Sequence, residues 1–135
     1  MYLLDTVSLS QTIKRRPDAR YAAWFARQDA ALLFVSVLTL GEVHKGIVRQ
    51  LSGDPHFAQA LRAWLSKARS DFAGRILDVT EPVALRWGEI VASGPTLPMI
   101  DTLIAATAQV HRLSVVTRNV RDFERTGVAV INPFD

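Results

Sequence analysis

Short runs of consecutive apolar residues alternate along this chain with longer segments whose apolar positions recur every three or four residues. A run without polar alternation is typical of a strand buried on both faces of a parallel sheet, and the longer period is typical of a helix packed on one side. The strands expected from these runs are residues 2–4, 32–35, 75–79, 113–116 and 128–131. We therefore predict an α/β fold with three layers, α/β/α, around a mostly parallel five-stranded sheet.

Helix boundaries are marked by caps and by Pro or Gly breaks. Asp18, Asp54 and Glu81, each beside a proline, predict helix starts. Gly94-Pro95 predicts the end of the helix that begins at Glu81. The positions expected to face the core are Tyr21, Ala22, Trp24 and Phe25; Leu40, Val43, Ile47 and Leu51; Phe57, Leu61, Trp64, Leu65, Ala68 and Phe72; and Leu85, Gly88 and Val91. Trp24, Trp64 and Trp87 are expected to pack in the core or in a dimer contact.

The segment that follows Pro98 predicts a helix with almost no polar face, because nearly every position from 103 to 108 is apolar or small. Asp101 lies in its first turn. A carboxylate removed from water needs a partner, since an unpaired buried ion costs several kcal/mol or neutralises. The structural explanation of Asp101 alone is a helix cap.

Three further acids fall where such a fold would gather them near Asp101. Parallel sheets bind ligands at the carboxyl ends of their strands, and Asp5, Glu42 and Asp122 follow the first, second and fourth expected strands. Each has a structural alternative: a turn residue for Asp5, a partner of Lys45 for Glu42, and a cap for Asp122. Together, carboxylates about 4 Å apart repel by roughly 4 kcal/mol at an effective dielectric near 20 and need a cation. Oxygen ligands without Cys favour Mg²⁺ or Mn²⁺.

Basic residues lie near these acids in the sequence. The net charge of +3 is mild, but the cations gather at Lys14-Arg15-Arg16, at Lys45 with Arg49, and at Arg118 with Arg121. A basic rim around an acidic centre suits a phosphate-bearing substrate, because the rim offsets the repulsion of an anion. A solvated basic surface is the structural alternative.

Length and composition predict a single domain over residues 1–135, since 49% of the residues are hydrophobic. The chain has no Cys and begins with an expected strand rather than an export signal. Its longest near-apolar run, residues 30–40, is too short to span a bilayer. We expect a cytoplasmic protein without membrane contact.

Other chemistries fit the motifs less well. Gly41 and Gly46 imitate a phosphate loop, but Ile47 stands where its Lys must be. The chain has no GxGxxG after a strand and no GxSxG elbow, and His44, His56 and His111 lack metal-ligand spacing and are expected at the surface. A phosphoryl-transfer domain of receiver or dehalogenase type remains an alternative and predicts phosphate on Asp5.

Four motifs, taken together, resemble one family. They are Leu4-Asp5-Thr6; Ser36-Val-Leu-Thr-Leu-Gly-Glu42-Val-x-Lys-Gly46; Leu97-Pro-x-x-Asp101-x-Leu-Ile-Ala-Ala-Thr-Ala; and Val116-Thr-Arg-Asn119-Val-Arg-Asp122-Phe123. In this order they resemble the PIN-domain ribonucleases, and among these the VapC toxins of bacterial toxin–antitoxin pairs, including the FitB-like branch. The resemblance covers essentially the whole chain. It departs from the family at Val7, where a polar residue is usual.

The resemblance implies a Mg²⁺- or Mn²⁺-dependent endoribonuclease. In this interpretation Asp5, Glu42, Asp101 and Asp122 surround the metal and are the catalytic groups, supported by Thr6, Thr117 and Asn119. Relatives place the last acid at the position of Asn119 or of Asp122, so both alternatives stay open. The candidates for RNA and phosphate contact are Lys45, Arg49, Arg118 and Arg121.

The resemblance also implies partners. We expect a homodimer, a VapB-like antitoxin whose tail fills the active-site groove, a tRNA or rRNA substrate, and operator DNA bound through the antitoxin. The alternative, from a different functional class, is a PIN-like subunit without catalysis that binds a partner or operator while its acids hold a structural cation.

Overall fold

The structure is a computed structural model that describes residues 1–94 and 96–134. It contains a five-stranded sheet with the order β3-β2-β1-β4-β5, and every neighbouring pair of strands is parallel. The strands are β1 (Tyr2–Leu4), β2 (Leu33–Ser36), β3 (Ile76–Leu77), β4 (Ser114–Val116) and β5 (Val130–Ile131). The predicted parallel α/β fold is therefore confirmed, with β1 at the centre.

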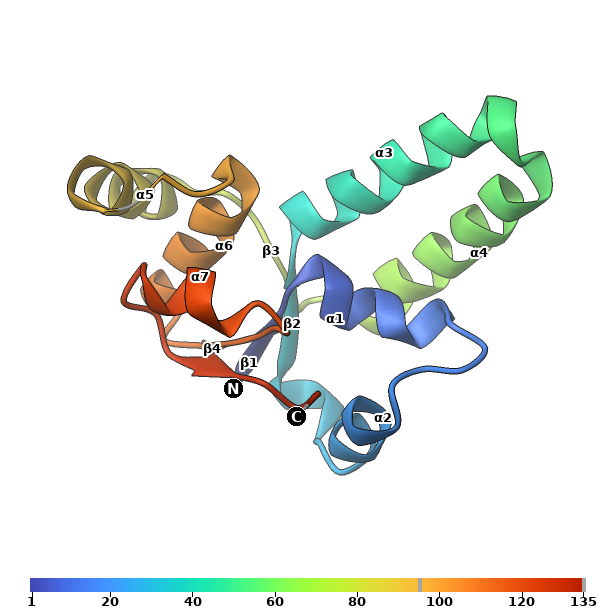
Figure 1. Cartoon of the computed structure of the whole chain (residues 1–135), viewed down its shortest axis with the longest axis horizontal. Helices are drawn as coiled ribbons and strands as arrows, with labels where there is room; N and C mark the ends of the chain where they lie inside the picture. Colours follow the sequence, from blue (N-terminus) through green and yellow to red (C-terminus); the bar gives the residue numbers. More distant parts are fainter. Residues whose placement is uncertain (95, 135) are drawn as a thin grey trace.

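Helices connect these strands and cover both faces of the sheet (Figure 1). The α-helices are α1 (Thr6–Ser10), α2 (Ala19–Ala26), α3 (Val37–Gly53), α4 (Pro55–Asp71), α5 (Glu81–Ser93), α6 (Met99–Val110) and α7 (Val120–Glu124). Two 3₁₀ turns, η1 (Gln11–Ile13) and η2 (Ala30–Leu32), follow α1 and precede β2. In Figure 1, α5 and α6 lie on one side of the strands and α3 and α4 on the other.

Neighbouring residues of the strands face opposite layers, as the period of two requires. Leu3 and Val115 belong to a core cluster with residues of α5 and α6. Leu4 and Val116 belong to a second cluster with Leu9 of α1 and Tyr21 of α2, against which Trp64 of α4 packs. The layers of helices are thus separated by one sheet, which confirms the three-layer prediction.

Helices α3 and α4 form an antiparallel pair that projects from the sheet (Figure 1). Ser36 caps α3 by accepting a hydrogen bond from the Leu38 amide at 3.0 Å, and Asp54 caps α4 by accepting one from the Phe57 amide at 3.1 Å. A small core cluster of Val43, Ile47 and Ala58 holds the pair together. The pair carries the Glu42 side of the candidate site.

The predicted inner face of α5 is wrong. Leu85 and Val91 are 63% and 45% exposed, whereas Val83 and Ile90 are buried in the first core cluster. Residues 83, 87 and 90 also follow a helical period, and the Trp87 indole donates to the Thr102 hydroxyl of α6 at 3.0 Å. Val83, Trp87 and Ile90 therefore form the face of α5 that packs toward α6. It ends at Ser93, and the expected stop at Pro95 lies outside the described residues.

Several residues that were predicted to be buried, or to belong to a strand, lie where the sheet does not cover them. Leu32 belongs to η2 and is 39% exposed, and Leu51 and Phe57 are exposed because they lie near the outer end of the α3–α4 pair. The third strand contains two residues at the sheet edge rather than five. The three tryptophans are half-buried and pack against the core clusters. Within the described ranges, no helix has the length and hydropathy needed to cross a membrane.

Candidate acidic site

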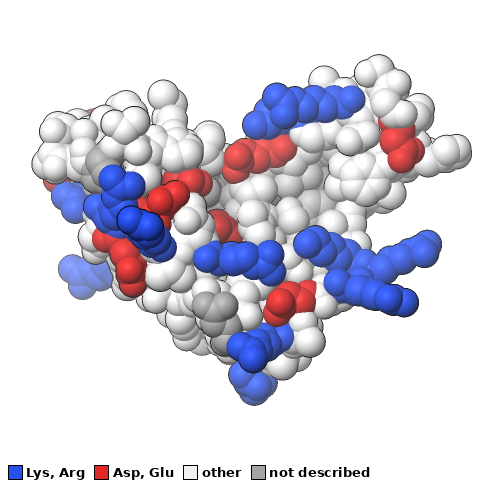
Figure 2. Space-filling view, in the orientation of Figure 1, with Lys and Arg blue, Asp and Glu red and all other residues white. Residues whose placement is uncertain are grey.

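The four predicted acids come from four separate segments that meet at the carboxyl ends of the central strands. β1 and β4 are neighbours, and the strand order reverses between them, which is where parallel sheets place ligands. Helix α6 leads into β4 after residues 111–113 and runs antiparallel to it, so its first turn reaches the same edge. Figure 2 shows acidic side chains inside the notch between α6 and α3, with basic side chains along α3 and below the notch.

Asp5 caps α1 and is 7% exposed. Its carboxylate accepts a hydrogen bond from the Ser8 amide at 2.8 Å and another from the Thr117 hydroxyl. Burial raises the pKa of Asp5, these hydrogen bonds oppose the rise, and the charge of Glu42 adds to it. The receiver-type alternative stays a prediction, and a search for phosphate on Asp5 tests it.

Glu42 lies on the flank of α3 that faces the notch. Its carboxylate accepts a hydrogen bond from the Thr6 hydroxyl, the residue that follows Asp5. The same hydroxyl lies 3.4 Å from the Thr39 hydroxyl, which is fully buried. No ion pair between Glu42 and Lys45 occurs in the described part of the chain. The structural alternative for Glu42 is therefore wrong, and Thr6 joins the Asp5 segment to α3.

Asp101 is the third residue of α6, two positions after the helix begins at Met99. Pro98 occupies the cap position, and no side chain caps this helix. Within residues 1–94 and 96–134, Asp101 makes no side-chain hydrogen bond or ion pair. The cap explanation of Asp101 is therefore wrong.

The pKa of Asp101 shows that the four acids share one electrostatic environment. Burial raises this pKa first, and the charges of Glu42, Asp5 and Asp122 raise it further, to about 6. Each of these charges must lie near enough to disfavour ionisation of Asp101. Asp101 is thus repelled by the three other carboxylates, and Asp5 is repelled by Glu42.

Asp122 lies in the first turn of the short helix α7 and does not cap it. Its carboxylate accepts a hydrogen bond from the Asn119 side chain at 2.9 Å. The backbone amide of Asn119 donates to the Thr117 hydroxyl at 2.9 Å. Thr117 in turn donates to Asp5. Asn119 and Asp122 are therefore hydrogen-bonded to each other. The two residues that the sequence left as alternatives for the fourth position belong to the same part of the site.

The donor set at this site suits a hard divalent cation. It consists of carboxylate and hydroxyl oxygens, and the chain contains no thiolate to favour a softer metal. The three histidines are exposed, as expected. Among the described residues, no group of three or more Asp, Glu or His side chains is already arranged to hold a metal ion. The acids would have to approach one another further to share one, and their mutual repulsion opposes this until a cation arrives.

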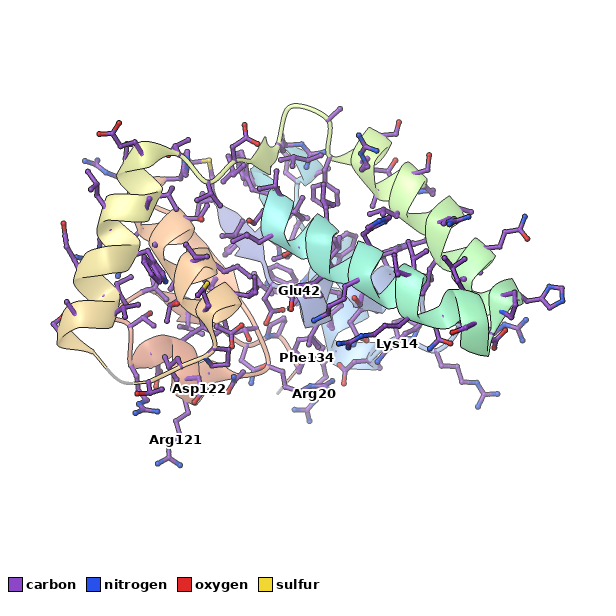
Figure 3. All side chains as sticks on the ribbon, turned by 90° about the horizontal axis from the view of Figure 1, so that it is seen from above. Lys14, Arg20, Glu42, Arg121, Asp122 and Phe134 are labelled. Atoms are coloured by element: carbon purple, nitrogen blue, oxygen red, sulfur yellow. The ribbon has the colours of Figure 1, made fainter. Side chains whose placement is uncertain are left out.

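The predicted basic residues are exposed around the notch. Lys45 and Arg49 lie on α3 beyond Glu42, and Lys45 lines a surface hollow of about 290 Å³ together with Glu42 and Ile100. Arg118 follows Thr117 and lies 3.8 Å from the Asp18 carboxylate. Figure 3 shows Arg121 pointing away from Glu42.

Three residues near the site were not predicted as part of it. Ser8 donates its amide to Asp5 and its hydroxyl to the Val116 carbonyl at 2.8 Å. Thr39 meets Thr6. Burial raises the pKa of the Tyr21 phenol, and the nearby charge of Asp5 raises it further. Ser8 and Thr39 are small hydroxyl residues in helices and Tyr21 belongs to an apolar stripe, so none of them carries a distinctive sequence signal.

A larger cavity lies elsewhere, between α1, α2 and α4. It encloses about 450 Å³ and is lined mainly by apolar side chains, among them Leu9, Phe25, Trp64 and Phe72. None of the four acids lines it. The candidate chemistry therefore belongs to the notch and not to this cavity.

Comparisons with known proteins concern the family and the fold of the chain. The family model described as PIN domain matches residues 2–129. The chain is 34% identical over 139 residues to Toxin FitB of Neisseria gonorrhoeae, covering 99% of each chain. It is 30% identical over 141 residues to VapC ribonuclease Y4jK of Sinorhizobium fredii, covering 100% of this chain and 99% of that one.

A solved structure of FitAB bound to an IR36 DNA fragment contains a chain with the same fold. It superposes with a TM-score of 0.88 at 32% identity, covering 100% of this chain and 96% of that one. The similarity extends over every strand and helix described above, including those that carry the four acids.

Proposed function

The chain belongs to the PIN-domain family, and we propose that it is a metal-dependent endoribonuclease that acts as the toxin of a toxin–antitoxin pair. The observation that carries the proposal is the placement of Asp5, Glu42, Asp101 and Asp122, from four separate segments, at the switch point of a parallel sheet. The raised pKa of Asp101 agrees with this placement. A relative named as a ribonuclease and another named as a toxin, both similar over nearly their whole length, support the same assignment.

The cofactor in this proposal is Mg²⁺ or Mn²⁺, held by the carboxylates of Asp5, Glu42, Asp101 and Asp122. A divalent ion supplies a water of lowered pKa and neutralises charge on a phosphodiester. The protein contributes the positions of the ligands. Thr6 orients Glu42, and Thr117 orients Asp5. Asn119 orients Asp122, and such supporting hydrogen bonds typically govern metal affinity.

The substrate in this proposal is RNA, and tRNA or rRNA fits the class. Lys45, Arg49, Arg118 and Arg121 are exposed and supply positive charge for phosphates on either side of the acids. The pI near 9.8 adds a general attraction for a polyanion.

The partners in this proposal are a VapB-like antitoxin, operator DNA bound through it, and a second copy of the chain. The solved FitAB complex on DNA supports the first two. The homodimer is carried over from the resemblance to the VapC toxins. We place the protein in the cytoplasm as a single PIN domain.

The test is cleavage of end-labelled tRNA and rRNA by the purified protein with Mg²⁺, with Mn²⁺ and with EDTA. Discrete cuts that require the metal and disappear in Asp101→Asn are the expected result. The matched control is Asp78→Asn, which removes an exposed acid after β3 and should cut like the wild type. Cuts that survive EDTA, or that persist in Asp101→Asn, would contradict the proposal.

The same assay separates the catalytic proposal from the binding-subunit alternative. A folded preparation that binds its antitoxin but cuts no RNA under any metal condition would favour a PIN-like subunit without catalysis. Antitoxin binding that survives Asp101→Asn while cleavage is abolished would favour the nuclease.

A further inference from the structure

Arg118 is held in place by two contacts that the proposed chemistry does not explain. Its guanidinium carbon lies 4.3 Å from the centroid of the Phe134 ring, and one of its nitrogens lies 3.8 Å from the Asp18 carboxylate. Its side chain is nevertheless 53% exposed. An arginine with one face on an aromatic ring and one edge on a carboxylate keeps its remaining N–H donors directed to solvent.

Phe134 is a rigid support for this guanidinium. It is 7% exposed and belongs to the second core cluster. Its ring stacks on Tyr21 with centroids 5.0 Å apart, and its amide donates to the Asn132 side chain at 3.0 Å. The ring therefore packs against the core residue Tyr21 and also contacts the Arg118 guanidinium.

Asp18 is fixed independently of Arg118. One carboxylate oxygen caps α2 by accepting from the Tyr21 amide at 2.9 Å, and the Asp18 amide donates to the Gln11 side chain at 2.9 Å. The other carboxylate oxygen faces Arg118. The helix cap thus already determines the orientation of the carboxylate that pairs with Arg118.

This arrangement lies beside the acidic site. Arg118 stands between Thr117, which donates to Asp5, and Asn119, which donates to Asp122. On the other side, Tyr21 connects Phe134 to the surroundings of Asp5. In the described part of the chain, Arg118 is paired with Asp18 and with none of the four acids.

We propose that Phe134 and Asp18 are positioning residues that hold Arg118 as a pre-oriented receptor for a substrate phosphate next to the one bound at the acids. A planar guanidinium binds a phosphate through two parallel hydrogen bonds, and fixing it beforehand reduces the rotamer freedom that binding removes. The inference rests on the proposed ribonuclease function and adds to it a role for the C-terminal segment.

The experiment compares KM and kcat for RNA cleavage in wild type, Arg118→Ala, Phe134→Leu and Phe134→Tyr. Phe134→Leu keeps an apolar side chain and removes the aromatic face, so KM should rise about two- to fivefold while kcat changes little. Phe134→Tyr keeps the face and should restore the wild-type KM. Asp18→Asn, which retains a capping side chain and removes the charge, should raise KM without loss of folding.

The matched control is Phe25→Leu. Phe25 also stacks on Tyr21, with centroids 5.8 Å apart, but the described residues place no arginine on it. Its replacement should lower thermal stability and leave KM unchanged. A direct readout is the NMR shift of the Arg118 side-chain protons, which the Phe134 ring displaces in wild type and Phe134→Tyr but not in Phe134→Leu.

A double-mutant cycle completes the test. If Phe134 acts through Arg118, the variant with both Arg118→Ala and Phe134→Leu should have the KM of Arg118→Ala alone. Additive effects, or a KM in Phe134→Leu equal to that in Phe25→Leu, would overturn the proposal while leaving the nuclease assignment intact. A wild-type protein that cuts no RNA would instead overturn the nuclease assignment on which the proposal rests, and the NMR readout would then report on the contact by itself.

Discussion

Among single residues, Asp101 is a carboxylate whose surroundings disfavour its charge. Asp101 gains no cap and no partner in the described residues, yet it lies within the field of three other carboxylates. Stability alone would favour an amide at this position. Charges kept at such a cost are characteristic of functional sites.

The first prediction concerns the pH dependence of stability in metal-free buffer. Because the pKa of Asp101 is raised to about 6, the folded state binds this proton more tightly than the unfolded chain does. The stability that this proton confers is complete below the unfolded value and is lost as the pH rises through about 6. Asp101→Asn should therefore melt above the wild type near pH 7.5 and close to it only near pH 3, below the unfolded value of 3.8.

Melting curves of wild type, Asp101→Asn and the exposed control Asp78→Asn, at both pH values, measure this difference. A fall in the melting temperature of Asp101→Asn near pH 7.5 would mean that the carboxylate stabilises α6 after all.

The second prediction concerns the hydroxyl that orients Glu42. Thr6→Val keeps the shape of the side chain and removes the donor to Glu42. Metal affinity should fall about 10- to 100-fold, as it does when supporting hydrogen bonds are removed at other metal sites. The control is Thr80→Val at the cap position of α5, where the hydroxyl makes no capping hydrogen bond. Equal metal affinity in Thr6→Val and wild type would remove Thr6 from the site.

Among secondary-structure elements, the sequence-based prediction succeeded where a segment had one possible buried arrangement. It failed where a helix had two possible buried faces. Runs such as Tyr2–Leu4 can be buried only as inner strands, and β1 and β4 appear as expected. In α5, residues 83, 87 and 90 and residues 85, 88 and 91 both have a helical period. Packing against α6 decides which of these sets is buried, and the residues of α5 alone do not indicate it.

The third prediction tests the corrected face of α5. Ile90→Ala should lower the free energy of unfolding by about 2 to 5 kcal/mol, because it leaves a cavity in the first core cluster. Leu85→Ala, 63% exposed in the single chain, should change it by less than about 0.5 kcal/mol. Urea denaturation at protein concentrations low enough to prevent self-association compares the two. The reverse order of the two effects would support the face predicted from periodicity.

Across the whole molecule, the sheet brings together residues that are far apart in the sequence. Asp5 and Asp122 are separated by most of the chain, yet the order β3-β2-β1-β4-β5 makes their strands neighbours. The acids could be predicted because parallel strands end at one edge and because the motifs resemble a known family. The contact of Phe134 with Arg118 could not, since no periodicity connects a C-terminal residue to a loop after β4.

The fourth prediction concerns the basic rim. Lys45 and Arg49 are exposed on α3 beside the notch, and removal of one cation that neutralises a phosphate should reduce the salt slope of binding by about 0.7 for single-stranded RNA. Replacing both by Gln in the Asp101→Asn background should therefore flatten the slope by about 1.4. The control replaces Lys67 and Arg69 of α4, away from the acids. Equal slopes in the two double variants would assign RNA binding to a different surface.

Four carboxylates from separate segments are assigned here to one cation-binding centre, and titration calorimetry with Mn²⁺ tests that assignment without RNA or a partner. The titration is made at a pH where all four acids are ionised. Wild type should bind Mn²⁺ and gain thermal stability, Asp101→Asn should lose most of this affinity, and Asp78→Asn should behave as wild type. Equal Mn²⁺ affinity in Asp101→Asn and wild type, or no binding by the wild type, would contradict a shared cation site.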